Sequence, residues 1–245
     1  MFKHLGETFE PFYREFAEMY DPNTEVGKRR IEQIKGVLQK YSPVKSGRVL
    51  DIGCNAGVST FALEELGFEV VGIDIDRKAI EKARENAKLR NSKAQFYIMD
   101  AKRLEFDDES FDLVVTLGYN LPHFSIYDFD EIVREAYRVL KPDGAIIVDY
   151  SDFVKALSAG IIKDVYVEEP FIAYHKGFDF KGGSRELFYV NLSEGYTFTM
   201  KTYLWSQWIV EFILRKVGFN VRTYPLTSMS VITIGEKKWS DNDDL

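Results

Sequence analysis

The sequence has very little cysteine, because Cys54 is the only one in 245 residues. A single thiol excludes a disulfide framework, a cysteine-based zinc site and an iron–sulfur cluster. No run of 18 apolar residues occurs, so no membrane-spanning helix is expected. Residues 1–10 lack the apolar core of a cleavable secretory signal. These absences predict a globular protein of the cytoplasm with no membrane partner.

Positive charge is also in deficit: 32 Lys and Arg face 39 Asp and Glu, and the formal net charge is −7. Such a chain is unsuited to gripping phosphate backbones over its whole surface, so a nucleic-acid partner is not expected. Aromatic residues are abundant, with 19 Phe, 14 Tyr and 3 Trp. More than half of them lie in residues 1–41 and 153–205, where acidic and basic residues balance. We expect these rings to wall an apolar pocket or, alternatively, to form a small core of their own.

Strand and helix patterns alternate through the middle of the chain. Apolar runs predict strands at 48–52, 69–74, 95–99, 111–117 and 145–149, with a turn at 141–144 before the last. Amphipathic spacing predicts helices at 58–66, 77–89 and 129–140. This alternation indicates a parallel sheet with crossover helices, a doubly wound α/β fold. A helix at 205–217 and strands at 220–224 and 230–234 close the chain. The connection between those strands is too short for a crossover, so they should be antiparallel.

Two segments flank this core. Apolar residues recur at helical spacing over 7–20 and 27–41, which predicts a helical cap. Strand patterns at 165–167, 186–190 and 196–200, separated by Gly182-Gly183 and Glu194-Gly195, predict an inserted β-rich lid. The expected organisation is a cap (1–41), a core (42–152), the lid (153–205), a C-terminal helix and strands that complete the core (206–239), and an acidic tail (240–245).

A glycine turn follows the first strand directly, as D-I-G-C-N-A-G over residues 51–57. Gly53 and Gly57 let the backbone approach a ligand closely, and the helix that follows offers free N–H groups. Asp74 ends the next strand, where it could accept hydrogen bonds from a ribose diol. A nicotinamide dehydrogenase would use the same arrangement, but its G-x-G-x-x-G fingerprint is incomplete here. That interpretation is therefore the weaker one.

These residues resemble the class I S-adenosylmethionine-dependent methyltransferases. V-L-D-I-G-C-N-A-G resembles the first motif of that family, and V-V-G-I-D-I-D, with Asp74 at the strand end, resembles the second. Met99-Asp100-Ala101 resembles the third, and F-D-L-V-V-T-L-G and L-K-P-D-G-A-I-I-V follow in the family's order. The resemblance implies a Rossmann-like sheet of seven strands whose last strand is antiparallel. Asn55 stands where the family has Gly, and Asn tolerates the positive φ that this turn needs.

The resemblance also implies S-adenosylmethionine as cofactor, with S-adenosylhomocysteine as product. The glycine loop would wrap the methionine end of the cofactor, Asp74 would hold the ribose, and Asp100 would meet the adenine. The cofactor-binding positions implied are Asp51, Gly53, Cys54, Asn55, Ala56, Gly57, Asp74, Ile75, Met99, Asp100, Ala101, Leu117 and Gly118, with Tyr13 and Tyr20 on the leading helix.

Methyl transfer needs a positioned acceptor and the exclusion of water, and it needs a base only if the acceptor arrives protonated. His123, after the fourth strand, is the candidate base, with a structural role as the alternative. The acids do not cluster after that strand, so no metal is expected. We expect a small-molecule acceptor and a monomer or homodimer. A protein or RNA methyltransferase and a non-catalytic cofactor-binding module remain open. The candidate residues of the substrate pocket are Tyr119, Asn120, Tyr150 and His175.

Overall fold

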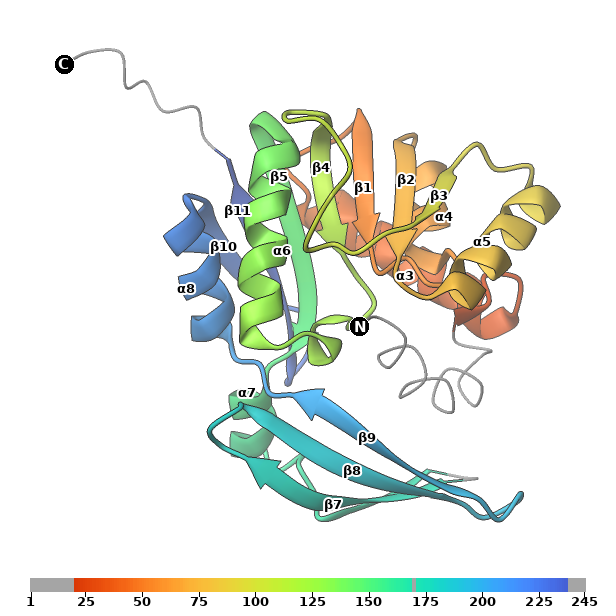
Figure 1. Cartoon of the computed structure of the whole chain (residues 1–245), viewed down its shortest axis with the longest axis vertical. Coiled ribbons are helices and arrows are strands. Elements are labelled where there is room, and N and C mark those ends of the chain that lie inside the picture. Colours follow the sequence, from red (N-terminus) through yellow and green to blue (C-terminus); the bar gives the residue numbers. More distant parts are fainter. Residues whose placement is uncertain (1–19, 169–170, 238–245) are drawn as a thin grey trace.

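The computed structural model describes residues 20–168 and 171–237 of the chain. Their strands form two separate sheets, one of seven strands and one of four (Figure 1). The expected helix over 7–20 and the acidic tail at 240–245 lie outside the described residues, except for Tyr20.

The seven-stranded sheet has the order β10-β11-β5-β4-β1-β2-β3. Strands β1 to β5 are parallel, whereas β11 is antiparallel to both of its neighbours. The prediction of a doubly wound α/β sheet with an antiparallel last strand is therefore confirmed. The strands are β1 (Arg48–Ile52), β2 (Glu69–Asp74), β3 (Gln95–Ile98), β4 (Phe111–Thr116), β5 (Leu140–Ser151), β10 (Asn220–Pro225) and β11 (Ser230–Glu236).

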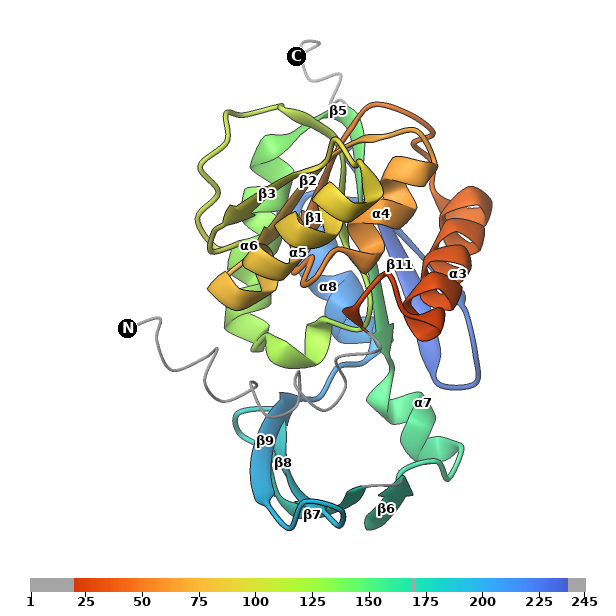
Figure 2. The same ribbon diagram turned by 90° about the vertical axis from the view of Figure 1, so that its right-hand side faces the viewer.

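Helices cover both faces of this sheet (Figure 2). Apolar side chains of α6 (Ile126–Val139) and α8 (Gln207–Val217) share one core with the sheet. On the other face lie α3 (Glu25–Tyr41), α4 (Val58–Glu65) and α5 (Arg77–Arg90). The central strands are buried on both faces, which explains their continuous apolar runs.

Two of the differences from the expected element boundaries have a local cause. Helix α6 begins three residues early, because Ser125 and Asp128 form a reciprocal capping box. The expected turn at 141–144 lies inside the long strand β5, as an irregularity in its pairing with β4. Asp143 has a φ of 64° there, so the turn chemistry is present but does not end the strand.

The smaller sheet has the order β6-β7-β8-β9, with every pair antiparallel. Figure 1 places it beyond the edge of the large sheet at which β5 ends, and Figure 2 shows it curving below that edge with α7 (Phe153–Ser158) beside it. The sequence pattern missed β7, which pairs with β8 over most of its length. The strands are β6 (Val165–Glu168), β7 (Phe171–Asp179), β8 (Ser184–Asn191) and β9 (Thr197–Tyr203).

Aromatic rings of the lid pack on one another. Tyr189 and Phe198 stack with ring centroids 4.7 Å apart and nearly parallel planes. Phe171 meets both of them edge-on. Such ring pairs stabilise a small sheet that has no second layer of its own. Part of the aromatic excess therefore forms a lid core, as the alternative interpretation expected.

Candidate functional site

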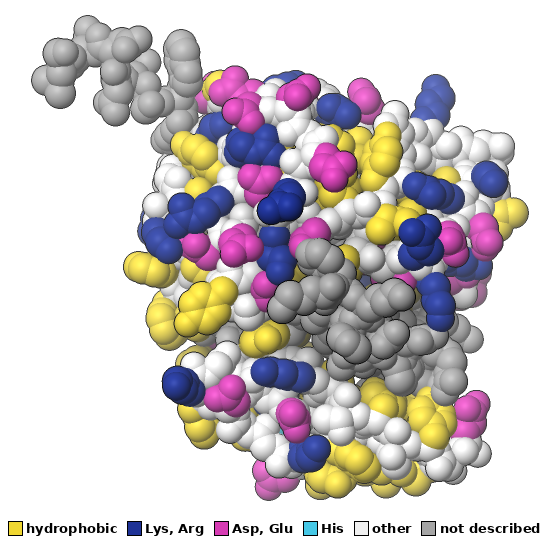
Figure 3. Space-filling view, viewed as in Figure 1, with side chains coloured by type: hydrophobic (Ala, Val, Ile, Leu, Met, Phe, Trp, Pro, Cys, Tyr) yellow, Lys and Arg dark blue, Asp and Glu magenta, His cyan; other side chains and the backbone are white. Residues whose placement is uncertain are grey.

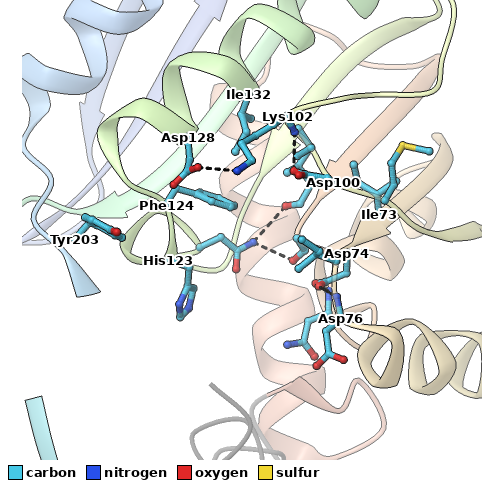
Figure 4. Close-up of a pocket in the computed structure, with 17 residues that line it drawn as sticks. Ile73, Asp74, Asp76, Asp100, Lys102, His123, Phe124, Asp128, Ile132 and Tyr203 are labelled. Atoms are coloured by element: carbon cyan, nitrogen blue, oxygen red, sulfur yellow. Dashed lines mark hydrogen bonds and ion pairs between the residues drawn. The ribbon is translucent and has the colours of Figure 1, made fainter. Parts of the chain in front are cut away.

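A pocket opens at the carboxyl edge of the large sheet, and we call it the edge pocket (Figure 4). This is the edge where ligands of open α/β sheets bind. Nine of the residues that the sequence analysis selected line it: Gly53, Asn55, Asp74, Ile75, Met99, Asp100, Ala101, Asn120 and His123. The fold thus brings together residues from the ends of β1, β2, β3 and β4.

The glycine loop between β1 and α4 has the backbone conformation that its residues suit. Gly53, Asn55 and Gly57 have φ values of 70°, 46° and 103°. The N–H groups of Gly53 and Cys54 both donate to the carbonyl of Ile73, which ties the loop to the end of β2. Gly57 caps α4 and provides no side chain there, so a ligand can reach the first turn of the helix.

Asp51 lies beneath the loop rather than in the pocket. It is fully buried, and its Oδ2 accepts hydrogen bonds from the hydroxyls of Ser59 at 2.7 Å and Thr60 at 2.6 Å. Burial raises the pKa of Asp51 to about 7, against the opposing effect of the two hydroxyls. Asp51 therefore links the end of β1 to the first turn of α4. Cys54 and Ala56 are likewise buried.

Asp74 forms the wall of the edge pocket at the end of β2. One carboxylate oxygen accepts the N–H of Asn55 at 3.0 Å, and the other accepts the N–H of Asp76 at 2.9 Å. Burial raises the pKa of Asp74 to about 6. Four lone-pair directions are available on a carboxylate. Two backbone bonds therefore leave capacity for hydroxyl donors of a ligand.

Asp100 and Lys102 line the edge pocket after β3, the strand next to β2. Asp100 accepts the backbone N–H of Lys102 at 3.0 Å. The ammonium of Lys102 pairs with Asp128 on α6 at 2.8 Å (Figure 4). This ion pair lies at the rim and joins the β3 loop to α6. Neither Lys102 nor Asp128 was selected from the sequence.

Asn120 holds the two ligand-facing loops together. Its side-chain amide donates to the carbonyl of Gly53 at 3.0 Å and to that of Leu117 at 2.9 Å. Gly118 and Tyr119, which lie between Leu117 and Asn120 in the chain, have φ values of 88° and 64°. The N–H of Tyr119 donates to Asp149 at 3.1 Å. Asn120 therefore lines the edge pocket and also sets its shape.

A small cleft continues from the edge pocket toward α3. It is lined by Tyr20, Arg30, Cys54, Leu117 and Gly118, among others. The Arg30 guanidinium lies 5.4 Å from the centre of the Tyr20 ring. A Cβ at Gly118 would lie 3.1 Å from Nη2 of Arg30, so glycine is needed for this close approach. Sequence reasoning missed Arg30, because helical spacing marks only the apolar face of α3.

His123 enters the edge pocket from the short helix η1 (Leu121–His123). Burial lowers its pKa to about 4, so the imidazole is neutral at pH 7. In Figure 4 its ring points away from Asp74 and Asp100. The ring is thus separated from the acidic wall of the pocket.

Three of the four expected pocket residues, Tyr119, Tyr150 and His175, lie elsewhere. Tyr150 is fully buried in the core under α8, and its hydroxyl bonds Thr233 on β11 at 2.8 Å. Its side chain cannot meet a substrate, because alternation along β5 turns it into the core while Asp149 faces the loop of Tyr119. His175 stands on β7 and stacks on Phe178 with ring centroids 4.9 Å apart. Neither His175 nor Tyr119 lines either of the two larger pockets. Tyr13 lies outside the described residues.

A second pocket, which we call the lid pocket, lies between the small sheet, α7 and η1. Its volume is about 430 Å³, against about 150 Å³ for the edge pocket. Tyr203, the last residue of β9, lines both pockets. The walls of the lid pocket are mainly apolar and include Phe153, Phe171, Leu187, Tyr189 and Trp205.

Among residues 20–168 and 171–237, no three His, Cys, Asp or Glu side chains lie together in a group that could hold a metal ion. No helix in the same residues is long and apolar enough to cross a membrane.

A family model described as a methyltransferase domain matches residues 49–144, which run from the second residue of β1 into β5. A demethylmenaquinone methyltransferase of Lactobacillus johnsonii is 32% identical over 142 residues, which are 56% of this chain and 54% of the relative. A ubiquinone biosynthesis O-methyltransferase of Pelagibacter ubique is 28% identical over 152 residues, 57% of this chain and 62% of the relative. The chain thus spans about half the length of the curated relatives it matches.

Solved structures resemble nearly the whole chain. The PH0226 protein from Pyrococcus horikoshii OT3 is 29% identical, with a TM-score of 0.77 over 93% of this chain and 99% of that one. CalS10, an amino pentose methyltransferase of Micromonospora echinaspora solved with S-adenosylmethionine, has a TM-score of 0.65 at 13% identity, over 94% of this chain and 96% of its own. At that identity the likeness concerns the fold.

Proposed function

We propose that this chain transfers a methyl group from S-adenosylmethionine to a small-molecule acceptor, because a family model described as a methyltransferase domain matches its residues 49–144. The observation that carries this proposal is the edge pocket. There the glycine loop, Asp74 and Asp100 come from the ends of three neighbouring parallel strands and face one cavity. This combination offers backbone donors, a ribose acceptor and an adenine acceptor in the order that the cofactor needs.

The nucleoside half of the cofactor fits the acidic wall of the edge pocket. Asp74 would accept the ribose hydroxyls with the lone pairs that Asn55 and Asp76 leave unused. Asp100 would accept a hydrogen bond from the adenine amino group. Ile75, which is 38% exposed, and Met99 would supply apolar contacts to the base.

The methionine half fits the cleft at α3. Its carboxylate would pair with Arg30, whose guanidinium lies against Gly118, and Tyr20 would close the cleft. This places the sulfonium near Leu117 and Gly118, on the way to the lid pocket.

The bound cofactor supplies a methyl group that an acceptor atom can displace in line. The task of this chain is to hold that atom at about 3–3.5 Å from the methyl carbon and to exclude water. His123 would take a proton from an acceptor that arrives protonated, because its lowered pKa leaves a ring nitrogen unprotonated at pH 7.

A small acceptor is favoured over a protein or RNA by the lid pocket, which lies beside the edge pocket and is walled by apolar side chains. We propose residues 153–205 as the lid that selects this acceptor. Basic and acidic side chains of the described residues intermingle on the face in Figure 3. The named relatives that methylate quinone precursors are consistent with a small acceptor.

Calorimetry with S-adenosylhomocysteine tests the cofactor half of the proposal. The wild-type protein should bind it, and Asp74→Asn should weaken binding about tenfold or more, because a carboxylate acceptor of ribose hydroxyls is lost. Asp107→Asn is the matched control: this exposed acid precedes β4 at the opposite edge of the sheet. Tight binding of NAD with none of S-adenosylhomocysteine would refute the proposal.

The Arg30→Gln variant tests whether Arg30 binds the amino-acid end of the cofactor and not its nucleoside end. The variant should bind S-adenosylhomocysteine about tenfold more weakly or worse, because an ionic hydrogen bond to the carboxylate is lost. Its affinity for 5′-methylthioadenosine, which has no amino-acid group, should be unchanged. Equal losses for both ligands would contradict our placement of the methionine end.

Turnover is tested by release of S-adenosylhomocysteine over a panel of small metabolites. Release with at least one of them supports an enzyme. Cofactor binding without release for any acceptor, including bulk protein and RNA, would favour a non-catalytic binding module.

A further inference from the structure

Arg185 on β8 is the only charged residue among the described residues that line the lid pocket. The other lining side chains are mainly apolar or aromatic. An arginine in such a wall requires an explanation, because a charge near apolar surface loses hydration and is stable only when it gains partners.

The contacts of Arg185 leave its charge unmatched. Its Nε donates to the hydroxyl of Thr202 at 3.2 Å, and its Cζ lies 5.8 Å from the centre of the Phe153 ring. The side chain is partly buried, and its Nη1 is a buried atom with no hydrogen-bond partner among the residues that the structure describes. None of the ion pairs within the described part of the chain includes it. Both of its recorded partners are neutral.

The next residue on the same strand shows the contrast. Glu186 points to the opposite face of the small sheet and pairs with Lys176 at 3.5 Å, where both side chains are about half exposed. The outer face of the lid therefore balances its charge, while the face toward the pocket presents one uncompensated cation. An anion that entered the lid pocket would supply the missing counter-charge. The planar fork of a guanidinium matches the two oxygens of a carboxylate.

The lid pocket is also in reach of the cofactor site. Tyr203 lines both pockets, and Pro122 of the lid pocket directly precedes His123 of the edge pocket. Figure 4 shows Tyr203 at the side of the edge pocket that faces away from Asp74 and Asp100. A molecule in the lid pocket can therefore extend past Tyr203 toward the methyl donor.

We propose that the acceptor is a flat, mainly apolar molecule that carries a carboxylate, that it binds in the lid pocket, and that Arg185 holds its carboxylate. This rests on the proposed methyltransferase function, because it assigns the acceptor class of that same site. The methyl-accepting atom would lie toward Tyr203, the residue that the two pockets share.

A pair of fluorescent probes tests the anion site without knowledge of the acceptor. 1-Anilinonaphthalene-8-sulfonate and N-phenyl-1-naphthylamine share one aromatic skeleton and differ by a sulfonate. Arg185→Gln should lower the affinity for the sulfonate probe about ten- to hundredfold, which is the range for a lost hydrogen bond to a charged group. The neutral probe should bind that variant as it binds the wild type. Lys176→Gln, which removes a cation from the outer face of the lid, should change neither affinity.

A competition experiment extends the test to carboxylates. Aromatic carboxylic acids such as 4-hydroxybenzoate and 4-aminobenzoate should displace the sulfonate probe, whereas their methyl esters should displace it about tenfold less well. In the release assay with S-adenosylmethionine, aromatic carboxylic acids should have a lower KM than their methyl esters. Arg185→Gln should remove that difference by raising KM for the acids.

The outcomes separate this proposal from the proposed function. Equal affinity of the sulfonate probe for the wild type and Arg185→Gln would overturn the acceptor class. If Arg185→Gln lowers the affinity for both probes, the Arg185→Lys variant decides between the explanations. Restored affinity for the sulfonate probe in Arg185→Lys supports the proposal, and affinity that is not restored overturns it. Binding of S-adenosylhomocysteine should be unchanged by Arg185→Gln. If the wild type does not bind S-adenosylhomocysteine, while Arg185→Gln still weakens binding of the sulfonate probe alone, the methyltransferase proposal is refuted and the anion site stands.

Discussion

The carboxyl group of Asp51 lies with zero exposure beneath the glycine loop, and this makes the stability of the protein depend on pH. Asp51→Asn replaces that group by a neutral one of the same shape. The amide oxygen can still accept the hydroxyls of Ser59 and Thr60, which bond Oδ2 in the wild type. The variant therefore removes the titration of this site with little change in its packing.

The size of the effect follows from the shift in pKa. Asp51 titrates near 3.8 when exposed and near 7 when folded, because burial disfavours its charge. The folded state thus keeps a proton that the unfolded state has lost. The stabilisation is fully present below about pH 4 and is lost as the pH rises through 7. The slope approaches about 1.4 kcal/mol per pH unit between the two pKa values and falls off near pH 7, where the folded group is half ionised, so raising the pH from 5 to 7 should lower the free energy of unfolding by about 2 kcal/mol through Asp51.

Urea denaturation between pH 5 and 8, without cofactor, measures this difference. The free energy of unfolding of the wild type should fall with pH more steeply than that of Asp51→Asn. Any constant cost of the new amide cancels when the two slopes are compared. Asp107→Asn, at an exposed position, should keep the wild-type slope. Identical slopes for the wild type and Asp51→Asn would refute the assignment of a protonated buried carboxyl below the loop.

Three other substitutions test positions in the fold. Gly57→Ala should destabilise the protein by about 1–3 kcal/mol in urea denaturation, because φ is 103° there and a Cβ would lie 2.6 Å from the ring of Phe61; an unchanged midpoint would contradict this geometry. Gly36→Ala, at an open position on α3, should instead stabilise it by about 0.5–1 kcal/mol in the same assay. Tyr150→Phe should lower the free energy of unfolding by about 1 kcal/mol, because the hydrogen bond to Thr233 is lost, and it should leave KM for the acceptor unchanged. A raised KM with an unchanged free energy of unfolding would show that Tyr150 contacts the substrate.

Local patterns were sufficient for the core, because each of its signals acts over a few residues. The apolar runs at β1 and β4 mark strands buried on both faces, and Gly53 and Gly57 mark a turn that needs positive φ. Parallel strands place their carboxyl ends at one edge, so Asp74 and Asp100 could be assigned to a common site from the sequence. The structure brings both of them to the edge pocket.

Contacts between distant segments could not be predicted in this way. Tyr150 follows Asp149 directly, yet the pairing of β5 with β11 turns one ring into the core and the neighbouring carboxylate toward the loop of Tyr119. Strand β7 was missed because its residues alternate weakly and its partner lies in β8.

The sequence by itself determined the order of the core elements, the glycine turn and the acids of the cofactor edge, because propensity, periodicity and strand polarity are properties of short segments. Only the tertiary structure decided that Arg30 approaches Gly118 and that Arg185 faces an apolar pocket without a counter-ion. A lone arginine has no local signature, because its function depends on which charges the fold places around it and which it keeps away.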